Sequence, residues 1–172
     1  MIRVRMGQIL IRELTDADRA AISAWSYAGE LSIYNPGPAA AALRAPDHVA
    51  LVSTTGGDMV GYGTMGSEAR VPGGAYDGSD EILDLGLGLH PDLVGHGQGA
   101  QALLALIEHG FRAHVLNRVR VTIALANKRA TRLVMRLEFR ETHRFERPAD
   151  GRRFVQYERD ATMDRSDQFE PR

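Results

Sequence analysis

A glycine-spaced loop that follows an apolar strand is the strongest indication in this sequence of how the chain folds. Gly95, Gly97 and Gly99 alternate with other residues between the apolar stretch 81–89 and a segment with helical periodicity. Glycines let the backbone come close to a ligand because no Cβ atom intervenes, and the first amide groups of a helix lack partners within the helix. This arrangement predicts a site for an anionic group, such as the phosphate of a cofactor.

Hydrophobic periodicity predicts alternating strands and helices along the chain. After the loop, Leu103, Leu104, Ile107 and Phe111 fall on one face of a helix, and residues 119–125 alternate apolar and polar side chains as a strand does. The other expected elements are strands at 8–13, 48–53, 59–65 and 81–89, helices at 16–25, at 39–44 and from near Asn127 onward, loops at 27–38 and 69–80, and a final hairpin of 140–147 with 152–159.

Spacing separates three kinds of nucleotide site that share such a loop. A phosphate-transfer P-loop is disfavoured because no lysine follows these glycines. Residues 95–100 satisfy the loose dinucleotide pattern G-x-G-x-x-A, but that site also needs an acidic residue about 20 positions further on to hold a ribose. Residues 109–137 contain no acidic side chain and several arginines, which suit additional phosphate better than a ribose diol.

Two segments, VGHGQGA at residues 94–100 and NKRATRLVMRLEF at residues 127–139, resemble motifs of the GNAT superfamily of N-acetyltransferases. Residues 94–100, VGHGQGA, are similar to that family's acetyl-CoA loop, in which an Arg or Gln precedes spaced glycines after a strand. Residues 127–139, NKRATRLVMRLEF, are similar to its second motif, N-x-x-A-x-x-L-Y-x-x-x-G-F. The matching positions of the second motif are Asn127, Ala130, Leu133 and Phe139. Both motifs occur in the family's order and separation, and the resemblance covers most of the chain, from residue 9 to residue 159.

The resemblance implies one acetyltransferase domain at residues 1–160, followed by a polar tail at 161–172. It implies an α/β (α+β) GNAT fold, a mixed and mostly antiparallel sheet of six to seven strands with helices on both faces. Acetyl-CoA is the implied cosubstrate, and its thioester carbonyl would be held by a backbone amide of the strand before the loop. The residues expected to bind it are Leu87, Gly88, Leu89, Gly95, His96, Gly97, Gln98, Gly99, Ala100 and Asn127.

Three positions depart from the family's motifs. Val94 stands where an Arg or Gln is usual, which removes one side chain near the pyrophosphate but none of the backbone donors. Val134 stands where many members have a Tyr thought to protonate the departing CoA thiolate, so the proton donor is open. Glu138 replaces the usual glycine before Phe139.

Composition narrows the class of protein and its partners. An apolar content of 44% suits one domain with a proper core. The net charge of −1 gives no indication of nucleic acid or an anionic membrane as a partner, and the absence of cysteine excludes thiol catalysis and argues against a zinc site. With no apolar run approaching about 18 residues and no signal peptide, we expect a cytoplasmic protein, a monomer or homodimer, that binds no metal.

Acetyl transfer to an amine needs a general base, and two carboxylates are candidates. Asp84 lies inside an otherwise apolar strand, where a buried charge needs a partner, so it either serves as the base, faces a solvated groove or pairs with an arginine. Glu68, at the end of another expected strand, is the other candidate for the base. The alternative is that Glu68 is simply a solvated side chain at the end of that strand. His90 is expected to be an exposed loop histidine, and Asn127 could simply cap a helix.

The acceptor is expected to bind against residues 25–35, WSYAGELSIYN, which occupy the position of the family's substrate-shaping region. Tyr27, Glu30 and Tyr34 are the candidate acceptor-binding residues, because a carboxylate framed by aromatic rings favours an ammonium group. The alternative is a loop packed over the core.

The sequence therefore predicts an acetyl-CoA-dependent N-acetyltransferase. The acceptor would be a primary amine of a small molecule or peptide, attacking directly in a ternary complex because no cysteine is present to form a covalent intermediate. The alternative is a non-catalytic acyl-CoA-binding or sensor module, and a dinucleotide oxidoreductase is a more distant one.

Overall fold

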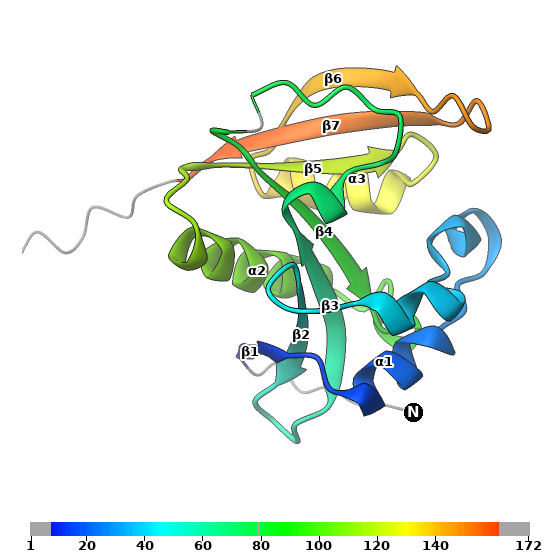
Figure 1. Ribbon diagram of the computed structural model, residues 1–172, viewed down its shortest axis with the longest axis vertical. Coiled ribbons are helices and arrows are strands. Elements are labelled where there is room, and N and C mark those ends of the chain that lie inside the picture. Colours follow the sequence, from blue (N-terminus) through cyan, green and yellow to red (C-terminus); the bar gives the residue numbers. More distant parts are fainter. Residues whose placement is uncertain (1–7, 79, 162–172) are drawn as a thin grey trace, which may run out of the picture.

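Seven strands form one mixed sheet in the computed structural model, which describes residues 8–78 and 80–161 (Figure 1). The strand order is β1-β2-β3-β4-β5-β7-β6, and all neighbours are antiparallel except β4 and β5. The strands are β1 (Ile9–Glu13), β2 (His48–Ser53), β3 (Met59–Met65), β4 (Leu83–Leu89), β5 (Arg118–Ala124), β6 (Arg140–Glu146) and β7 (Arg153–Asp160). The expected mixed sheet is confirmed. Apart from Ala161, the expected polar tail lies outside the described residues.

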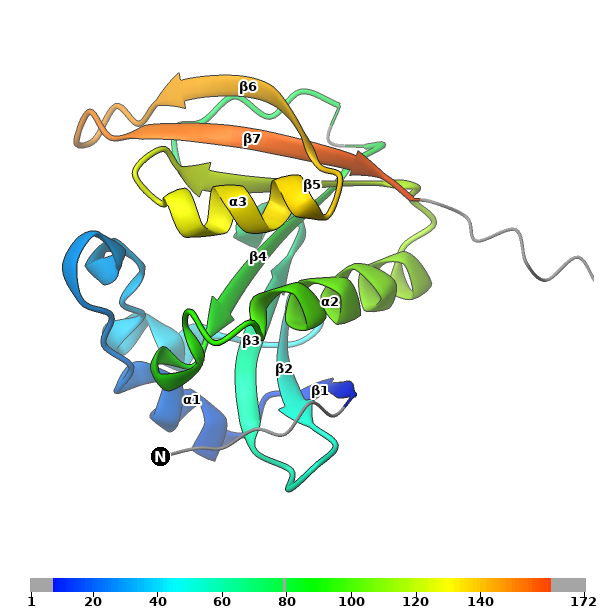
Figure 2. The ribbon, with the colours of Figure 1, turned by 180° about the vertical axis from the view of Figure 1, so that it is seen from behind.

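Helices cover both faces of this sheet (Figures 1 and 2). One face carries α1 (Asp16–Ser23) and the short 3-10 helices η1 (Gly29–Tyr34) and η2 (Gly37–Ala42), and the other carries α2 (Gly99–Ala113) and α3 (Lys128–Arg136). No helix in the described part of the chain is long and apolar enough to cross a membrane.

The segment between α1 and β2 differs from the expected loop and short α-helix. Residues 27–38 contain η1, and the helix expected at 39–44 is the 3-10 turn η2. Pro38 stands in the first turn of η2, and Gly37 has a positive φ of 53°, so this stretch is too short and too constrained for an α-helix.

Side-chain caps fix where the helices begin. Thr15 and Asp18 form a capping box at α1, in which each side chain accepts a hydrogen bond from the other residue's backbone amide. Asn127 caps α3, because its side-chain oxygen accepts from the amide of Ala130 at 3.1 Å. The expected helix starts at both positions are confirmed.

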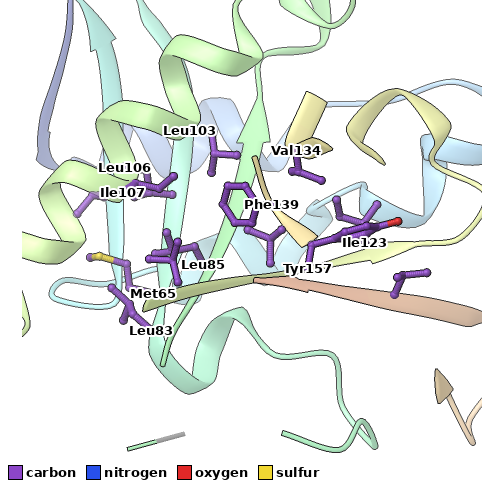
Figure 3. Packing of buried hydrophobic residues seen from close by; sticks show 14 residues of the cluster. Met65, Leu83, Leu85, Leu103, Leu106, Ile107, Ile123, Val134, Phe139 and Tyr157 are labelled. Atoms are coloured by element: carbon purple, nitrogen blue, oxygen red, sulfur yellow. The ribbon is translucent and has the colours of Figure 1, made fainter. Parts of the chain in front are cut away.

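The main core lies between the sheet and helices α2 and α3 (Figure 3). Leu85 of β4 packs with Leu106 of α2, while Val134 and Phe139 close the core under α3. The helix approaches the sheet closely, since a Cβ added at Gly110 of α2 would lie 2.7 Å from Leu83. This packing holds α2 in a fixed position against the sheet.

Candidate functional site

The two central parallel strands separate halfway along their length. β5 pairs with β4 only from Leu83 to Leu85, opposite Val119 to Val121, and the strands then diverge (Figures 1 and 2). We call the space between residues 86–89 of β4 and residues 122–124 of β5 the strand opening. Backbone groups of both strands that face it are not paired across the sheet.

The hydrogen-bond alternation of β4 identifies those groups. The amide of His90 donates to the carbonyl of Val60 on β3 at 2.9 Å. In an antiparallel ladder, the N–H and C=O groups of alternate residues point to opposite sides of the strand. Those of Leu87 and Leu89 therefore point away from β3 and into the strand opening, with Gly88 between them.

The glycine-spaced loop joins this end of β4 to α2. The short helix η4 (Pro91–Leu93) begins it, and Gly95 and Gly97 have φ angles of 83° and 78°, which glycine adopts without strain. Among the described residues, the amides of Gly97, Gln98, Gly99 and Ala100 donate hydrogen bonds to no protein group. The loop thus presents a row of free amide donors at a helix start, a geometry suited to an anion.

Close packing also requires a glycine at position 99, which the sequence did not reveal. A Cβ at this position would clash with Leu133 of α3 and would lie 3.5 Å from Leu89. Gly97 has open space around its Cβ position, so its positive φ is the only constraint there. The two glycines therefore differ in what a substitution would disturb.

Arg129 of α3 brings a positive charge to the loop. A Cβ built on Gly95 would lie 3.0 Å from Nη1 of Arg129, so the guanidinium rests directly over the glycine backbone. The neighbouring Asn127 uses its side-chain oxygen to cap α3. Arg129 therefore supplies a cation near the loop although Val94 lacks one, and no spacing rule could single it out from the basic run around it.

Two tyrosine hydroxyls tie residues 25–35, which we call the strap, to the two sides of the strand opening. Tyr27 donates to the carbonyl of Leu89 on β4 at 2.6 Å, and Tyr34 accepts from the amide of Ala124 on β5 at 3.1 Å. Burial raises the pKa of Tyr27 well above its ordinary value, with a smaller contribution from Tyr62, so its hydroxyl stays protonated.

The rest of the strap divides into packing residues and exposed ones. The ring of Trp25 is buried, 5.9 Å from the ring of Tyr62 and 5.2 Å from that of His90. The half-buried His90 accepts from the amide of Asp92 through Nδ1. Trp25 and Tyr27 thus behave as the loop packed over the core that the sequence left open, whereas Glu30 and Tyr34 are exposed.

Asp84 lies in a buried ion-pair cluster on the α1 face of the sheet. Its two oxygens accept from Arg120 at 2.6 and 2.9 Å, and Arg70 adds a third contact at 2.8 Å. Asp84 and Arg120 are each only 2% exposed. Burial lowers the pKa of Arg120, but the hydrogen bonds and charge of Asp84 more than offset this and raise it overall. This is the arginine pairing that the sequence left open.

Glu68 lies beside the start of the strand opening. It is exposed in the short helix η3 (Gly66–Ala69), and a Cβ added at Gly86 would lie 3.8 Å from the Cβ of Ala69. Gly86 is the first residue of β4 beyond its pairing with β5. Within residues 8–78 and 80–161, no three His, Asp or Glu side chains come together as a metal site would require.

The Acetyltransferase (GNAT) domain model matches residues 8–140 of the chain. The chain belongs to the GNAT acetyltransferase family. The match covers the strap, the strand opening, the glycine loop and α3. Comparison with curated proteins gives no significant match.

Solved structures with the same fold include three described acetyltransferases. A GNAT-family acetyltransferase of Bacillus anthracis is 16% identical, covering 91% of this chain and 96% of its own, with a TM-score of 0.69. The aminoglycoside acetyltransferase AAC(6')-Ib, in complex with paromomycin and acetyl-CoA, is 16% identical over 93% of this chain and 99% of its own, with a TM-score of 0.67. A chimera of the spermidine N-acetyltransferase SpeG of Vibrio cholerae with hSSAT is 15% identical over 88% and 95%, with a TM-score of 0.59.

In this GNAT protein, the position of the second motif's tyrosine holds a buried apolar side chain. Val134 is 3% exposed and packs in the main core beside Phe139 (Figure 3). At the strand opening, Ala124 contacts the strap through its backbone amide alone. A backbone contact of this kind leaves no side-chain signal in the sequence.

Proposed function

We propose that this protein transfers the acetyl group of acetyl-CoA to a primary amine of a small molecule or peptide, by direct attack in a ternary complex. The observation that carries the proposal is the separation of β4 from β5 directly before a loop of free amide donors. An extended thioester arm can lie in the strand opening while its phosphates meet the loop.

The backbone groups that make no hydrogen bond within the protein indicate where acetyl-CoA would bind. The amide N–H of Leu87 or Leu89 would polarise the thioester carbonyl, and Gly88 between them would let the arm lie against the strand. The backbone of residues 95–100, which includes His96, Gln98 and Ala100, would bind the pyrophosphate. Arg129 would supply the charge that Val94 does not. Asn127 would contribute mainly by fixing the start of α3.

The acceptor would enter at the strap, where Glu30 and Tyr34 are exposed and Tyr27 anchors the segment to β4. An exposed carboxylate next to the entrance attracts a cationic amine. The aminoglycoside and spermidine acetyltransferases named above share the fold and act on polycationic amines. This supports a cationic acceptor for the present protein.

Glu68 is the better of the two candidate bases. A general base must be able to take a proton, directly or through one water. Glu68 is exposed beside the start of the strand opening, whereas both oxygens of Asp84 are occupied by arginine N–H groups. We therefore assign Asp84 a structural role and Glu68 the catalytic one.

The cofactor site can be tested with two glycines of similar geometry. Gly97 and Gly57 have φ angles of 78° and 74° and open space at the Cβ position, but Gly57 lies in the β2–β3 turn. Either Gly→Ala change should cost about 1–2 kcal/mol of stability through backbone strain. Only Gly97→Ala should weaken acetyl-CoA binding, by about tenfold in calorimetry. Equal affinities in both variants would remove the loop as the binding site.

Activity is tested by release of CoA thiol with a panel of amines that includes spermidine, an aminoglycoside, amino acids and a peptide N-terminus. Turnover with any of them supports the transferase. The absence of a tyrosine at Val134 favours a second candidate, a non-catalytic acyl-CoA sensor, which would bind acetyl-CoA tightly and turn over none of the panel.

A further inference from the structure

Transfer of an acetyl group from a thioester leaves a thiolate that needs a proton. The amine nitrogen attacks the carbonyl carbon, a C–N bond forms, and the C–S bond then breaks with its electron pair on sulfur. Free thiols have a pKa of about 8.5, so near neutral pH the departing sulfur is protonated by a nearby donor or by water. Val134, buried in the core, offers no such donor.

Most tyrosine hydroxyls in the described residues are already committed or buried. Tyr27 gives its proton to the carbonyl of Leu89. Tyr76 lies in the loop over the sheet, where its hydroxyl accepts from the amide of Val71 and shares a hydrogen bond with Thr122. Tyr157 is 4% exposed in the main core, and burial raises the pKa of Tyr62. None of these four tyrosines is exposed.

Tyr34 is exposed, and its hydroxyl contacts the backbone at the strand opening. It is 36% exposed, and its hydroxyl oxygen accepts a hydrogen bond from the amide of Ala124 at 3.1 Å. That bond uses a lone pair and leaves the O–H proton without an acceptor among the described residues. Ala124 is the last residue of β5, on the side of the strand opening.

One cation of the described residues interacts with Tyr34. Arg147, from the turn between β6 and β7, lies over the ring of Phe154, the strand partner of Ala124, at 5.2 Å. Its hydrogen bond to Asp150 raises the pKa of Arg147 most, and interaction with Tyr34 adds a smaller contribution. Arg147 is paired with Asp150, which also contacts Arg152, and Glu30 belongs to the same short helix as Tyr34.

We propose that the hydroxyl of Tyr34 donates the proton to the departing thiolate, the role that Val134 cannot take. This inference rests on the proposed acetyl transfer. The sulfur becomes a thiol and Tyr34 becomes a tyrosinate. The tyrosinate regains a proton from solvent, while the proton lost by the amine nitrogen leaves through the general base. The strap thereby carries both acceptor recognition and proton donation.

The test uses two changes at position 34 and one control. Tyr34→Phe removes the donor, and 3-fluorotyrosine at position 34 keeps the hydroxyl with a lower phenol pKa. Tyr76→Phe is the matched control, since it also removes a hydrogen-bonded hydroxyl that contacts β5, here through the side chain of Thr122 and not through a backbone amide. The measurements are acetyl-CoA affinity by calorimetry and kcat by thiol release, with the amine that supports turnover in the panel.

Tyr34→Phe should lower kcat at least tenfold and leave the acetyl-CoA Kd within about twofold. Tyr76→Phe should leave both near the wild-type values. The fluorotyrosine protein should stay active, with the alkaline limb of its kcat profile moved to lower pH. The proposal is overturned if Tyr34→Phe keeps kcat within threefold, or if affinity falls as much as kcat. Wild-type protein that does not bind acetyl-CoA would instead overturn the proposed function.

Discussion

At the scale of single residues, the most informative side chain is Asp84. Its position in an apolar strand indicated either a catalytic or a paired carboxylate, and residue type alone could not separate these. Two arginines from distant parts of the chain, Arg70 and Arg120, meet it in the folded protein. The sheet brings β4 and β5 together, and that contact is absent from any local pattern.

Asp84→Asn should lower the free energy of unfolding by about 3–5 kcal/mol, because it removes the carboxylate charge that pairs with the buried Arg120 and leaves only Glu158, 3.8 Å from that guanidinium. Urea denaturation measures this cost. The matched change Asp160→Asn removes an exposed partner of Arg118 and should cost far less. A normal stability for Asp84→Asn, combined with a loss of kcat, would return Asp84 to the role of general base.

At the scale of elements, the end of α3 shows a departure from the family motif with a definite geometric cost. Glu138 has a φ of 64°, the left-handed conformation that glycine usually occupies. Its amide bonds to the carbonyl of Met135, and the amide of Phe139 bonds to that of Val134. These two bonds form a Schellman motif. Helix α3 therefore ends in the geometry that a glycine at position 138 would also adopt.

Glu138→Gly should therefore raise the free energy of unfolding by about 0.5–1 kcal/mol, the strain of a side chain in this conformation less the entropy of a more flexible unfolded chain. Glu138→Ala keeps a Cβ and should bring no such gain. Thermal and urea unfolding of the two variants provide the measurement. If alanine proved as stabilising as glycine, the left-handed strain would not be the cause.

At the scale of the whole molecule, the candidate site is assembled from the strap, β4, the loop before α2, the end of β5 and the start of α3. A ligand that binds only this assembled form stabilises the folded state. Acetyl-CoA at about 100 times its Kd should add about 2.7 kcal/mol. For a domain of this size that corresponds to a rise in Tm of roughly 5–11 °C.

Thermal melting with increasing acetyl-CoA measures this rise, and NAD at the same concentrations is the control. NAD should leave Tm unchanged, since residues 109–137 hold no acidic residue for a ribose. A rise with NAD alone would favour the dinucleotide alternative.

The sequence by itself determined the elements and their order. Spaced glycines, period-two strands and helix caps act over a few residues, so β2, β3, the start of α3 and the loop at Gly97 could be located from local chemistry. The boundaries of the predicted elements were least accurate between α1 and β2. Prolines and glycines in this segment favour 3-10 turns over regular α-helix.

Only the tertiary structure decided how those elements share one site. The pairing of Asp84 with Arg120, the position of Arg129 over Gly95 and the contact of Tyr34 with Ala124 join residues far apart in the chain. Each depends on how strands pair and helices pack, and the last uses a backbone group that carries no residue identity. Local sequence patterns encode neither kind of information, because side-chain periodicity reports which face is buried and not what lies against it.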